Sequence, residues 1–120
     1  VIAAARTEWS RVVAVFEPNR FNRMAVMSDE YGDAFVDADV IVVTDIYSSG
    51  TKPIDGVTGE LVVDAIRRRH PDAVVEWAPQ RRELAAVVDQ LVRDGDVCIS
   101  MGCGDIETLP REILDLRHGA

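Results

Sequence analysis

Two hydrophobic patterns alternate along this chain, and their alternation limits the folds that it can adopt. Short runs of consecutive apolar residues, typical of strands that are covered on both faces of a parallel sheet, occur at 11–16, 40–45 and 97–101, with a weaker run at 73–77. Helical periods of about 3.6 residues occupy 24–36, 59–69, 81–93 and 105–116, and residues 1–6 are interpreted as the end of a further helix. This order predicts a three-layer α/β fold with a mostly parallel sheet, formed as a single domain over residues 1–120.

Composition and charge exclude several classes of protein. Apolar residues make up 48% of the 120 residues, which is enough for one core and too many for a disordered chain. The 13 basic and 21 acidic side chains give a net charge of −8, which argues against nucleic acid as a partner. No apolar run approaches the ~20 residues of a membrane span, and no secretion signal is visible, so we expect a cytoplasmic protein without a membrane partner. Because the sequence opens without methionine in an alanine-rich stretch, we expect it to be a fragment.

The expected topology directs attention to one edge of the sheet. In an open parallel sheet, ligands bind beyond the carboxyl ends of the strands, at the point where the strand order reverses. If the order is 3-2-1-4, this point lies between the first and fourth strands. The loops that follow these strands, 17–23 and 102–105, are the most unusual in the chain, and the long irregular stretch at 46–58 follows the second strand at the same edge.

The first of these loops holds two arginines, Arg20 and Arg23, close to the expected start of a helix that Asn22 would cap. A helix N-terminus and two guanidinium groups together can bind a carboxylate or a phosphate. The alternative is that both arginines are solvated and pair with neighbouring acids. The pattern alone does not separate the two interpretations.

The other loops at this edge carry weaker signals. Gly102 and Gly104 permit close approach of the backbone, and Asp105 either caps the last helix or reaches an amine or ribose of a ligand. Tyr47 either lines a pocket or is simply packed. The chain contains neither of the glycine-rich motifs that bind nucleotide phosphates.

The cysteines and histidines do not predict a reactive centre. Cys98 is expected to be buried and unreactive, and Cys103 lies in the glycine loop with no histidine near it in sequence. His70 and His118 are expected to be solvated at helix ends. Their spacing from the cysteines does not fit a zinc site, so we expect no metal site and no catalytic residue in this fragment.

Several segments, taken together, resemble the C-terminal domain of the Mur ligases of bacterial cell-wall synthesis. These are VFEPNRFNR at 15–23, TDIY at 44–47, PIDGV at 53–57, GDV at 95–97 and MGCGDI at 101–106, which stand in order and with matching spacing. The likeness spans nearly the whole chain. It implies a Rossmann-like domain of a three-domain cytoplasmic ligase, and it is closest to the branch that adds L-alanine to UDP-N-acetylmuramate.

The resemblance also implies a division of labour. The first domain of such a ligase binds the UDP-sugar and the middle domain binds ATP with Mg²⁺, so the sugar carboxylate becomes an acyl phosphate that the amine of L-alanine attacks. Arg20 and Arg23 match the arginines that position the L-alanine carboxylate. The fragment alone is expected to be inactive. The full set of candidate substrate-binding residues is Arg20, Arg23, Asn19, Phe21, Tyr47, Gly102 and Asp105.

The chain departs from the usual pattern of the family at four positions of the first loop and helix. The family commonly has His, Tyr, Thr and Arg where this chain has Asn19, Phe21, Asn22 and Ala25. Three other interpretations remain open: a ligase that joins a preformed peptide to the same sugar, a non-catalytic α/β binding module of the receiver type, and a free-standing nucleotide-binding fold. The receiver type needs paired acids at the strand ends. Asp45 ends the second strand, but the sequence shows no acid after the first strand that would complete the pair.

Overall fold

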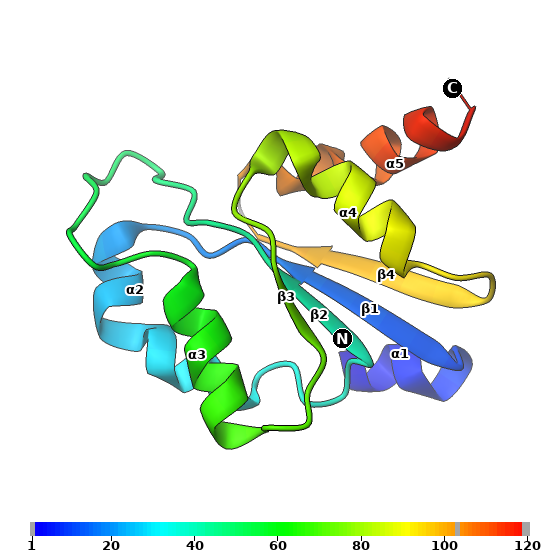
Figure 1. The fold of residues 1–120 in the computed structure, drawn as a ribbon, viewed down its shortest axis with the longest axis horizontal. Coiled ribbons are helices and arrows are strands. Elements are labelled where there is room, and N and C mark those ends of the chain that lie inside the picture. Colours follow the sequence, from blue (N-terminus) through cyan, green and yellow to red (C-terminus); the bar gives the residue numbers. More distant parts are fainter. Residues whose placement is uncertain (1, 103, 119–120) are drawn as a thin grey trace.

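The computed structural model describes residues 2–102 and 104–118 and confirms a three-layer α/β fold (Figure 1). Its sheet has the order β3-β2-β1-β4, and every pairing within it is parallel. The reversal of strand order therefore lies between β1 and β4, as predicted. The strands are β1 (Arg11–Phe16), β2 (Val40–Val43), β3 (Val75–Trp77) and β4 (Asp96–Met101).

Helices follow the strands as expected, but with different bounds. The α-helices are α1 (Ile2–Glu8), α2 (Phe21–Met27), α3 (Glu60–Arg69), α4 (Leu84–Leu91) and α5 (Leu109–His118). Single 3₁₀ segments occupy Ser28–Asp33, Arg81–Glu83 and Asp105–Thr108. Three of the four helical periods are thus part α-helix and part 3₁₀-helix.

The prediction of one helix over 24–36 is wrong. Helix α2 begins three residues earlier and ends at Met27, and the 3₁₀ segment continues from there. This segment packs closely on α3, because a Cβ atom at Gly32 would lie 2.6 Å from Arg69 Cδ and 3.0 Å from the Ala65 carbonyl oxygen. Packing on α3 therefore sets the path of the chain here, and the local apolar period does not.

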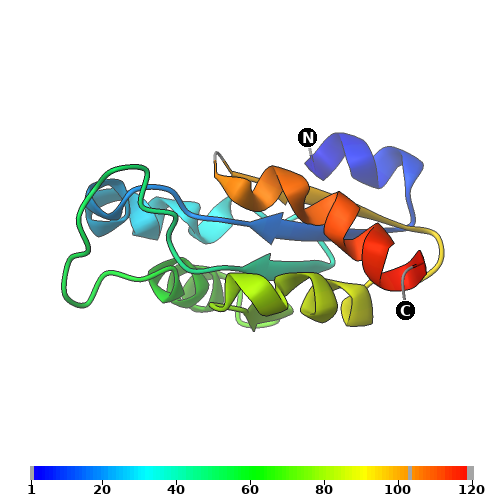
Figure 2. The ribbon, with the colours of Figure 1, turned by 90° about the horizontal axis from the view of Figure 1, so that it is seen from above.

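The core divides into two clusters, one on each face of the sheet. Val12 and Ala14 of β1 face the side covered by α1, α2 and α3, whereas Val13 and Val15 face the side covered by α4 and α5 (Figures 1 and 2). All four side chains are fully buried. This explains the continuous apolar run in β1, since a strand between two helical layers has no solvent face.

The two edges of the sheet differ. Among the described residues β3 has three residues and β4 has six, and each pairs with a neighbour on one side only. Cys98 lies in β4, where burial is the main cause that raises the pKa of its thiol to about 11, with the charge of Asp96 adding to it. Cys98 is only partly buried, and its raised pKa is consistent with the predicted lack of reactivity. No helix of the described chain is long and apolar enough to cross a bilayer.

Candidate functional site

Hydrogen bonds extend the sheet beyond the carboxyl ends of β1, β2 and β4. The Thr44 N–H donates to the carbonyl of Phe16 at 3.0 Å, and the Glu17 N–H donates to the carbonyl of Met101 at 2.9 Å. The loops after all three strands therefore leave the sheet side by side. This places residues 17–23, 44–58, 102 and 104–105 at one edge of the molecule, as the predicted topology required.

A second set of bonds joins the loop after β1 to the loop after β2. Asn19 and Tyr47 form an isolated parallel β-bridge. In this bridge the Tyr47 N–H donates to the carbonyl of Pro18, and the Arg20 N–H donates to the carbonyl of Tyr47, both at 2.9 Å. Two of the predicted site residues, far apart in sequence, are thus held together through the backbone.

Arg20 has an unusual backbone conformation. It stands at the N-cap of α2 with φ 68° and ψ 124°, a left-handed region that costs a non-glycine residue about 1–3 kcal/mol. The bond to Tyr47 and the Met24 N–H, which donates to the Arg20 carbonyl at 3.1 Å, hold this conformation in place. Backbone strain of this kind is found where the surrounding structure fixes the direction of a side chain.

Arg20 and Arg23 are both exposed, and neither side chain has a hydrogen-bond or ion-pair partner among the described residues. They lie three positions apart, Arg20 at the N-cap of α2 and Arg23 in its first turn. The alternative in which they pair with neighbouring acids finds no support in these contacts. Both guanidinium groups are available to an anion.

The predicted cap of α2 is wrong. Asn22 lies inside the helix and is exposed, and no side chain at the N-cap position bonds to the helix. Instead, the hydroxyl of Thr51 accepts the N–H of Phe21 at 3.0 Å. The hydrogen bond that fixes the start of α2 therefore comes from the long loop after β2, thirty residues away. Phe21 itself is half-buried.

The glycine loop packs closely against the other two loops. Gly102 has φ 155°, and a Cβ atom there would lie 2.9 Å from Ile106 Cγ2. A Cβ at Gly104 would lie 2.5 Å from Tyr47 Cγ and 2.6 Å from Glu17 Oε1. The close approach predicted for these glycines is confirmed at both positions, whereas only Gly102 has a positive φ, since Gly104 has φ −101°. Tyr47 is packed against Gly104 and still 41% exposed. Cys103 lies outside the described residues.

Glu17 carries the largest electrostatic perturbation at this edge. The residue is only 4% exposed, and its Oε1 atom is buried without a hydrogen-bond partner. The pKa of this carboxyl is raised from 4.5 to about 7, mainly by burial and then by the neighbouring Asp105. Arg81 and the Ile106 N–H act in the opposite direction and lower it by less. Near neutral pH, Glu17 therefore exchanges readily between its acid and carboxylate forms.

Asp105 does not cap the last helix as one interpretation had it. Gly104 occupies the N-cap position, without a side-chain bond. The carboxylate of Asp105 instead accepts a hydrogen bond from Arg81 Nε at 3.2 Å. The same guanidinium holds both carboxylate oxygens of Glu112 in α5, at 2.9 and 2.8 Å. Arg81 therefore ties the glycine loop to α5.

Sequence reasoning did not single out Glu17 or Arg81 as members of this site. Glu17 follows a buried strand directly and precedes a proline, which is the one local sign that its side chain would be enclosed. Arg81 gives no local sign, because its partners lie more than twenty residues further along the chain. The predicted substrate-binding residues do come together at one edge. They are Asn19, Arg20, Phe21, Arg23, Tyr47, Gly102 and Asp105.

Asp45 has a structural part in the turn before α3. Its Oδ1 accepts the N–H groups of Ile46 at 2.8 Å and of Gly59 at 3.1 Å. It does not join Glu17 and Asp105 in an acidic cluster. No group of three or more ligating side chains suited to a metal ion occurs in residues 2–102 and 104–118.

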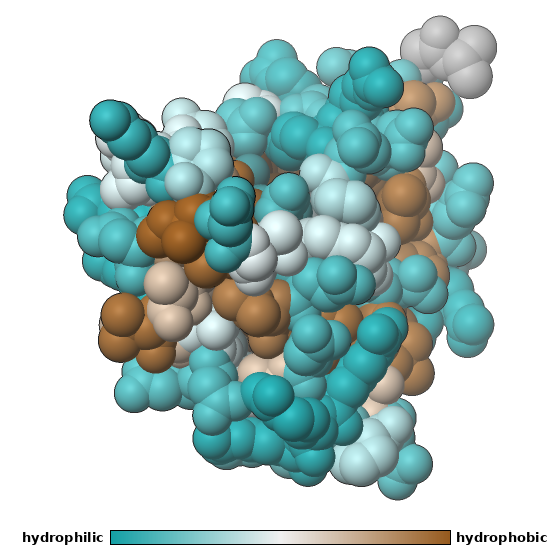
Figure 3. All heavy atoms as spheres, turned by 60° about the vertical axis from the view of Figure 1, so that its left-hand side comes forward, coloured by the Kyte–Doolittle hydropathy of each residue, from teal (hydrophilic) through white to brown (hydrophobic). Residues whose placement is uncertain are grey.

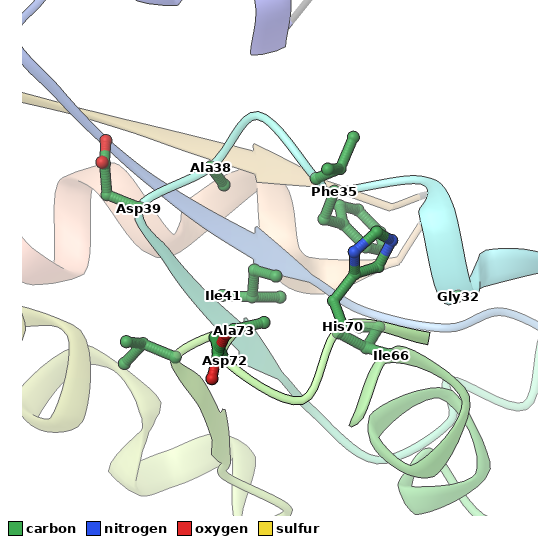
Figure 4. Close-up of a pocket in the computed structure, with 11 residues that line it drawn as sticks. Gly32, Phe35, Ala38, Asp39, Ile41, Ile66, His70, Asp72 and Ala73 are labelled. Atoms are coloured by element: carbon green, nitrogen blue, oxygen red, sulfur yellow. The ribbon is translucent and has the colours of Figure 1, made fainter. Parts of the chain in front are cut away.

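A cavity of about 340 Å³ lies away from this edge (Figure 4). It is lined by Asp39 and Ala73, which precede β2 and β3, and by Phe35 and His70. The expectation that His70 is solvated is only partly met: its ring is half-exposed and Nε2 lies 2.7 Å from Asp33 Oδ1. The cavity is at the amino ends of the strands, where the topology places no ligand site.

The surface beside the candidate site is mixed in character. Figure 3 turns forward the side with α2 and the long loop, and it shows apolar patches set among hydrophilic residues. Exposed apolar side chains on these elements are Val26, Met27 and Ile54.

Curated proteins of one name are similar to this chain over most of its length. The UDP-N-acetylmuramate--L-alanine ligase of Pelotomaculum thermopropionicum is 41% identical over 104 residues, which cover 87% of this chain and 22% of that ligase. Ligases of the same name from Gloeobacter violaceus and an Anaeromyxobacter species are 41% and 44% identical, over 94% and 88% of this chain. The chain spans 22–24% of the length of these three relatives. No protein-family model matches the chain.

The strained backbone at Arg20 predicts a difference between two substitutions. Arg20→Gly relieves the left-handed conformation, whereas Arg20→Ala keeps it, so the glycine variant should be the more stable by about 1 kcal/mol. Urea unfolding of the two variants measures the difference. Equal midpoints would show that the conformation is not strained.

The buried carboxyl of Glu17 predicts a pH-dependent stability. Because its folded pKa of about 7 exceeds 4.5, the folded state binds the proton more tightly, so stability falls as the pH rises from about 4.5 to about 7. The free energy of unfolding of the wild type should be lower at pH 8 than at pH 4 by about 3 kcal/mol on account of Glu17. Glu17→Gln should not show this decrease. Urea unfolding across this range, with the exposed Glu30→Gln as control, tests it, and parallel curves for wild type and Glu17→Gln would contradict it.

Proposed function

The chain belongs to the Mur ligase family as the counterpart of one segment of the UDP-N-acetylmuramate--L-alanine ligases, and we propose that it is the C-terminal, amino-acid-presenting domain of such an enzyme. The proposed reaction joins L-alanine to UDP-N-acetylmuramate, with consumption of ATP, in peptidoglycan synthesis. The proposed location is the cytoplasm, where the family works. Residues 1–120 form one domain in this proposal.

One observation carries the proposal beyond sequence similarity. In a chain with a net charge of −8, Arg20 and Arg23 are exposed and have no acidic partner in the described part of the chain. They stand at the sheet edge where a parallel fold binds its ligands. Two free guanidinium groups three residues apart suit the carboxylate of an amino acid, which accepts paired hydrogen bonds from arginine.

The proposed contribution of this domain is positioning. A carboxylate held by two arginines fixes the direction of the amine on the same carbon atom. The amine then meets the activated sugar carboxyl in one orientation, which replaces a random encounter with an arranged one. Preference for L-alanine would rest on a small pocket for its methyl group, which discriminates only modestly between similar side chains.

The described residues do not fit ATP or Mg²⁺. No three of them are grouped as metal ligands, and the sequence has no phosphate-binding glycine motif. We therefore assign ATP, Mg²⁺ and the UDP-sugar to other parts of the ligase. This domain alone is expected to be inactive.

The other interpretations have less support. The receiver type requires acids free to take a phosphoryl group, and the Asp45 carboxylate is used in a turn. A ligase for preformed peptides keeps the same fold, but the curated relatives carry L-alanine in their name. Amino-acid specificity separates these two ligases.

The test is phosphate release from ATP by the ligase that contains this chain, with UDP-N-acetylmuramate and a panel of amino acids and short peptides. Release is expected with L-alanine. Arg20→Ala or Arg23→Ala should raise KM for L-alanine about ten- to a hundredfold, the loss expected for a charged hydrogen bond, with KM for ATP unchanged.

Arg93→Ala is the matched control, because Arg93 is exposed and lies before β4, at the opposite end of the strands. It should leave all constants unchanged. Release that depends on a tripeptide and not on L-alanine would favour the peptide ligase. Alanine kinetics unaltered by both Arg20→Ala and Arg23→Ala would reject the assignment of the carboxylate.

A further inference from the structure

A buried oxygen without a partner lies at the edge where the proposed function places the amino acid. Folded proteins pair nearly all their buried polar groups, because an unpaired one costs about 1–3 kcal/mol and a charged one costs more. Glu17 Oε1 is unpaired, in a residue that is 4% exposed. Its environment is therefore incomplete without a hydrogen-bond donor that the described residues do not supply.

A second unpaired oxygen belongs to the same loop. Asn19 Oδ1 is also buried without a hydrogen-bond partner. Asn19 lies two positions after Glu17 in a segment that continues β1 into the bridge with Tyr47, and residues two apart in an extended segment leave the backbone on the same side. Two buried acceptor oxygens without partners in one short loop fit a ligand group that donates several hydrogen bonds.

We propose that Glu17, with Asn19 beside it, receives the amino group of the incoming amino acid and takes a proton from it. The inference rests on the proposed function, since Arg20 and Arg23 hold the carboxylate of the same molecule. An amino acid arrives as a zwitterion, with an ammonium group that donates three hydrogen bonds and an anionic carboxylate. The loop after β1 offers a matching pair of groups, arginines for one end and oxygens for the other.

The proton transfer balances. The ammonium group of the amino acid gives one proton to the Glu17 carboxylate, which leaves a neutral amine and a carboxylic acid. The amine nitrogen then forms a C–N bond with the acyl carbon, while the bond from that carbon to the phosphate oxygen breaks and phosphate leaves with the electron pair. After the C–N bond has formed, the nitrogen carries one proton more than an amide does. This second proton goes to the departing phosphate.

The surroundings of Glu17 suit a base that works near neutral pH. Its pKa of about 7 is set by burial and by Asp105 of the glycine loop, with Arg81 opposing them. A general base is most effective when its pKa lies near the working pH. A Cβ atom at Gly104 would lie 2.5 Å from Tyr47 Cγ and 2.6 Å from Glu17 Oε1, so the exposed Tyr47 ring lies close to this oxygen.

The test compares two ligands in the ligase that contains this chain. L-Alanine has both groups, whereas propionate has the carboxylate and lacks the amine. Glu17→Gln keeps the shape of the side chain and removes its basicity. It should raise KM for L-alanine about tenfold and lower kcat about a hundredfold, while the inhibition constant of propionate changes less than twofold. Arg20→Ala should weaken both ligands.

The pH profile separates proton transfer from a structural role. The kcat of the wild type should fall below about pH 7, and Glu17→Gln should lose this acidic limb. Glu17→Asp, which keeps a carboxyl, should retain it. The exposed Glu30→Gln is the matched control and should behave as the wild type, and thermal melting checks that each variant is folded.

Three outcomes would count against the proposal in different ways. If Glu17→Gln keeps the KM for L-alanine and the acidic limb while Arg20→Ala weakens both ligands, the inference about Glu17 is wrong and the proposed function stands. If Glu17→Gln weakens propionate as much as L-alanine, Glu17 has only a structural role. If Arg20→Ala and Arg23→Ala affect neither ligand, the proposed function fails, and the inference fails with it.

Discussion

The pairing of β1 on both sides is the interaction on which the rest of this structure depends. Its backbone bonds to β2 and β4 in parallel, so three chain segments arrive at the same edge pointing the same way. The bonds continue past the strand ends, from the Glu17 N–H to the Met101 carbonyl and from the Tyr47 N–H to the Pro18 carbonyl. The loops are thereby fixed to one another by backbone groups.

The sequence was sufficient to locate the four strands, and the order assumed for them is the observed one, but the start of α2 was placed three residues too late. A strand buried on both faces, such as β1, leaves an unbroken apolar run that local reasoning can find. The start of α2 depends on the Thr51 hydroxyl, thirty residues away, and the 3₁₀ segment after it depends on close packing against Arg69. Interactions between distant segments leave no local pattern, so Asn22 was the wrong choice for the cap.

One part of the candidate site could likewise be predicted from the sequence and another part could not. Arg20 and Arg23 could be proposed from the sequence because their spacing and loop position are local properties, and the resemblance to the Mur ligases added their role. The raised pKa of Glu17 could not be predicted from the sequence. It comes from burial under residues of two other loops and from the neighbouring Asp105. Charge alone ranks Glu17 among 21 acidic residues, and only the fold distinguishes it.

The unequal edges of the sheet bear on how this chain behaves when it is prepared by itself. The short β3 exposes few unpaired backbone groups, whereas β4 presents the outer side of six residues, and no described segment covers it. A long uncovered edge is a template for strand addition and aggregation. The Arg11–Asp96 ion pair is at one end of β4 only. Self-association at high concentration would therefore begin at β4, and lysine or proline introduced on its outer side would be the remedy.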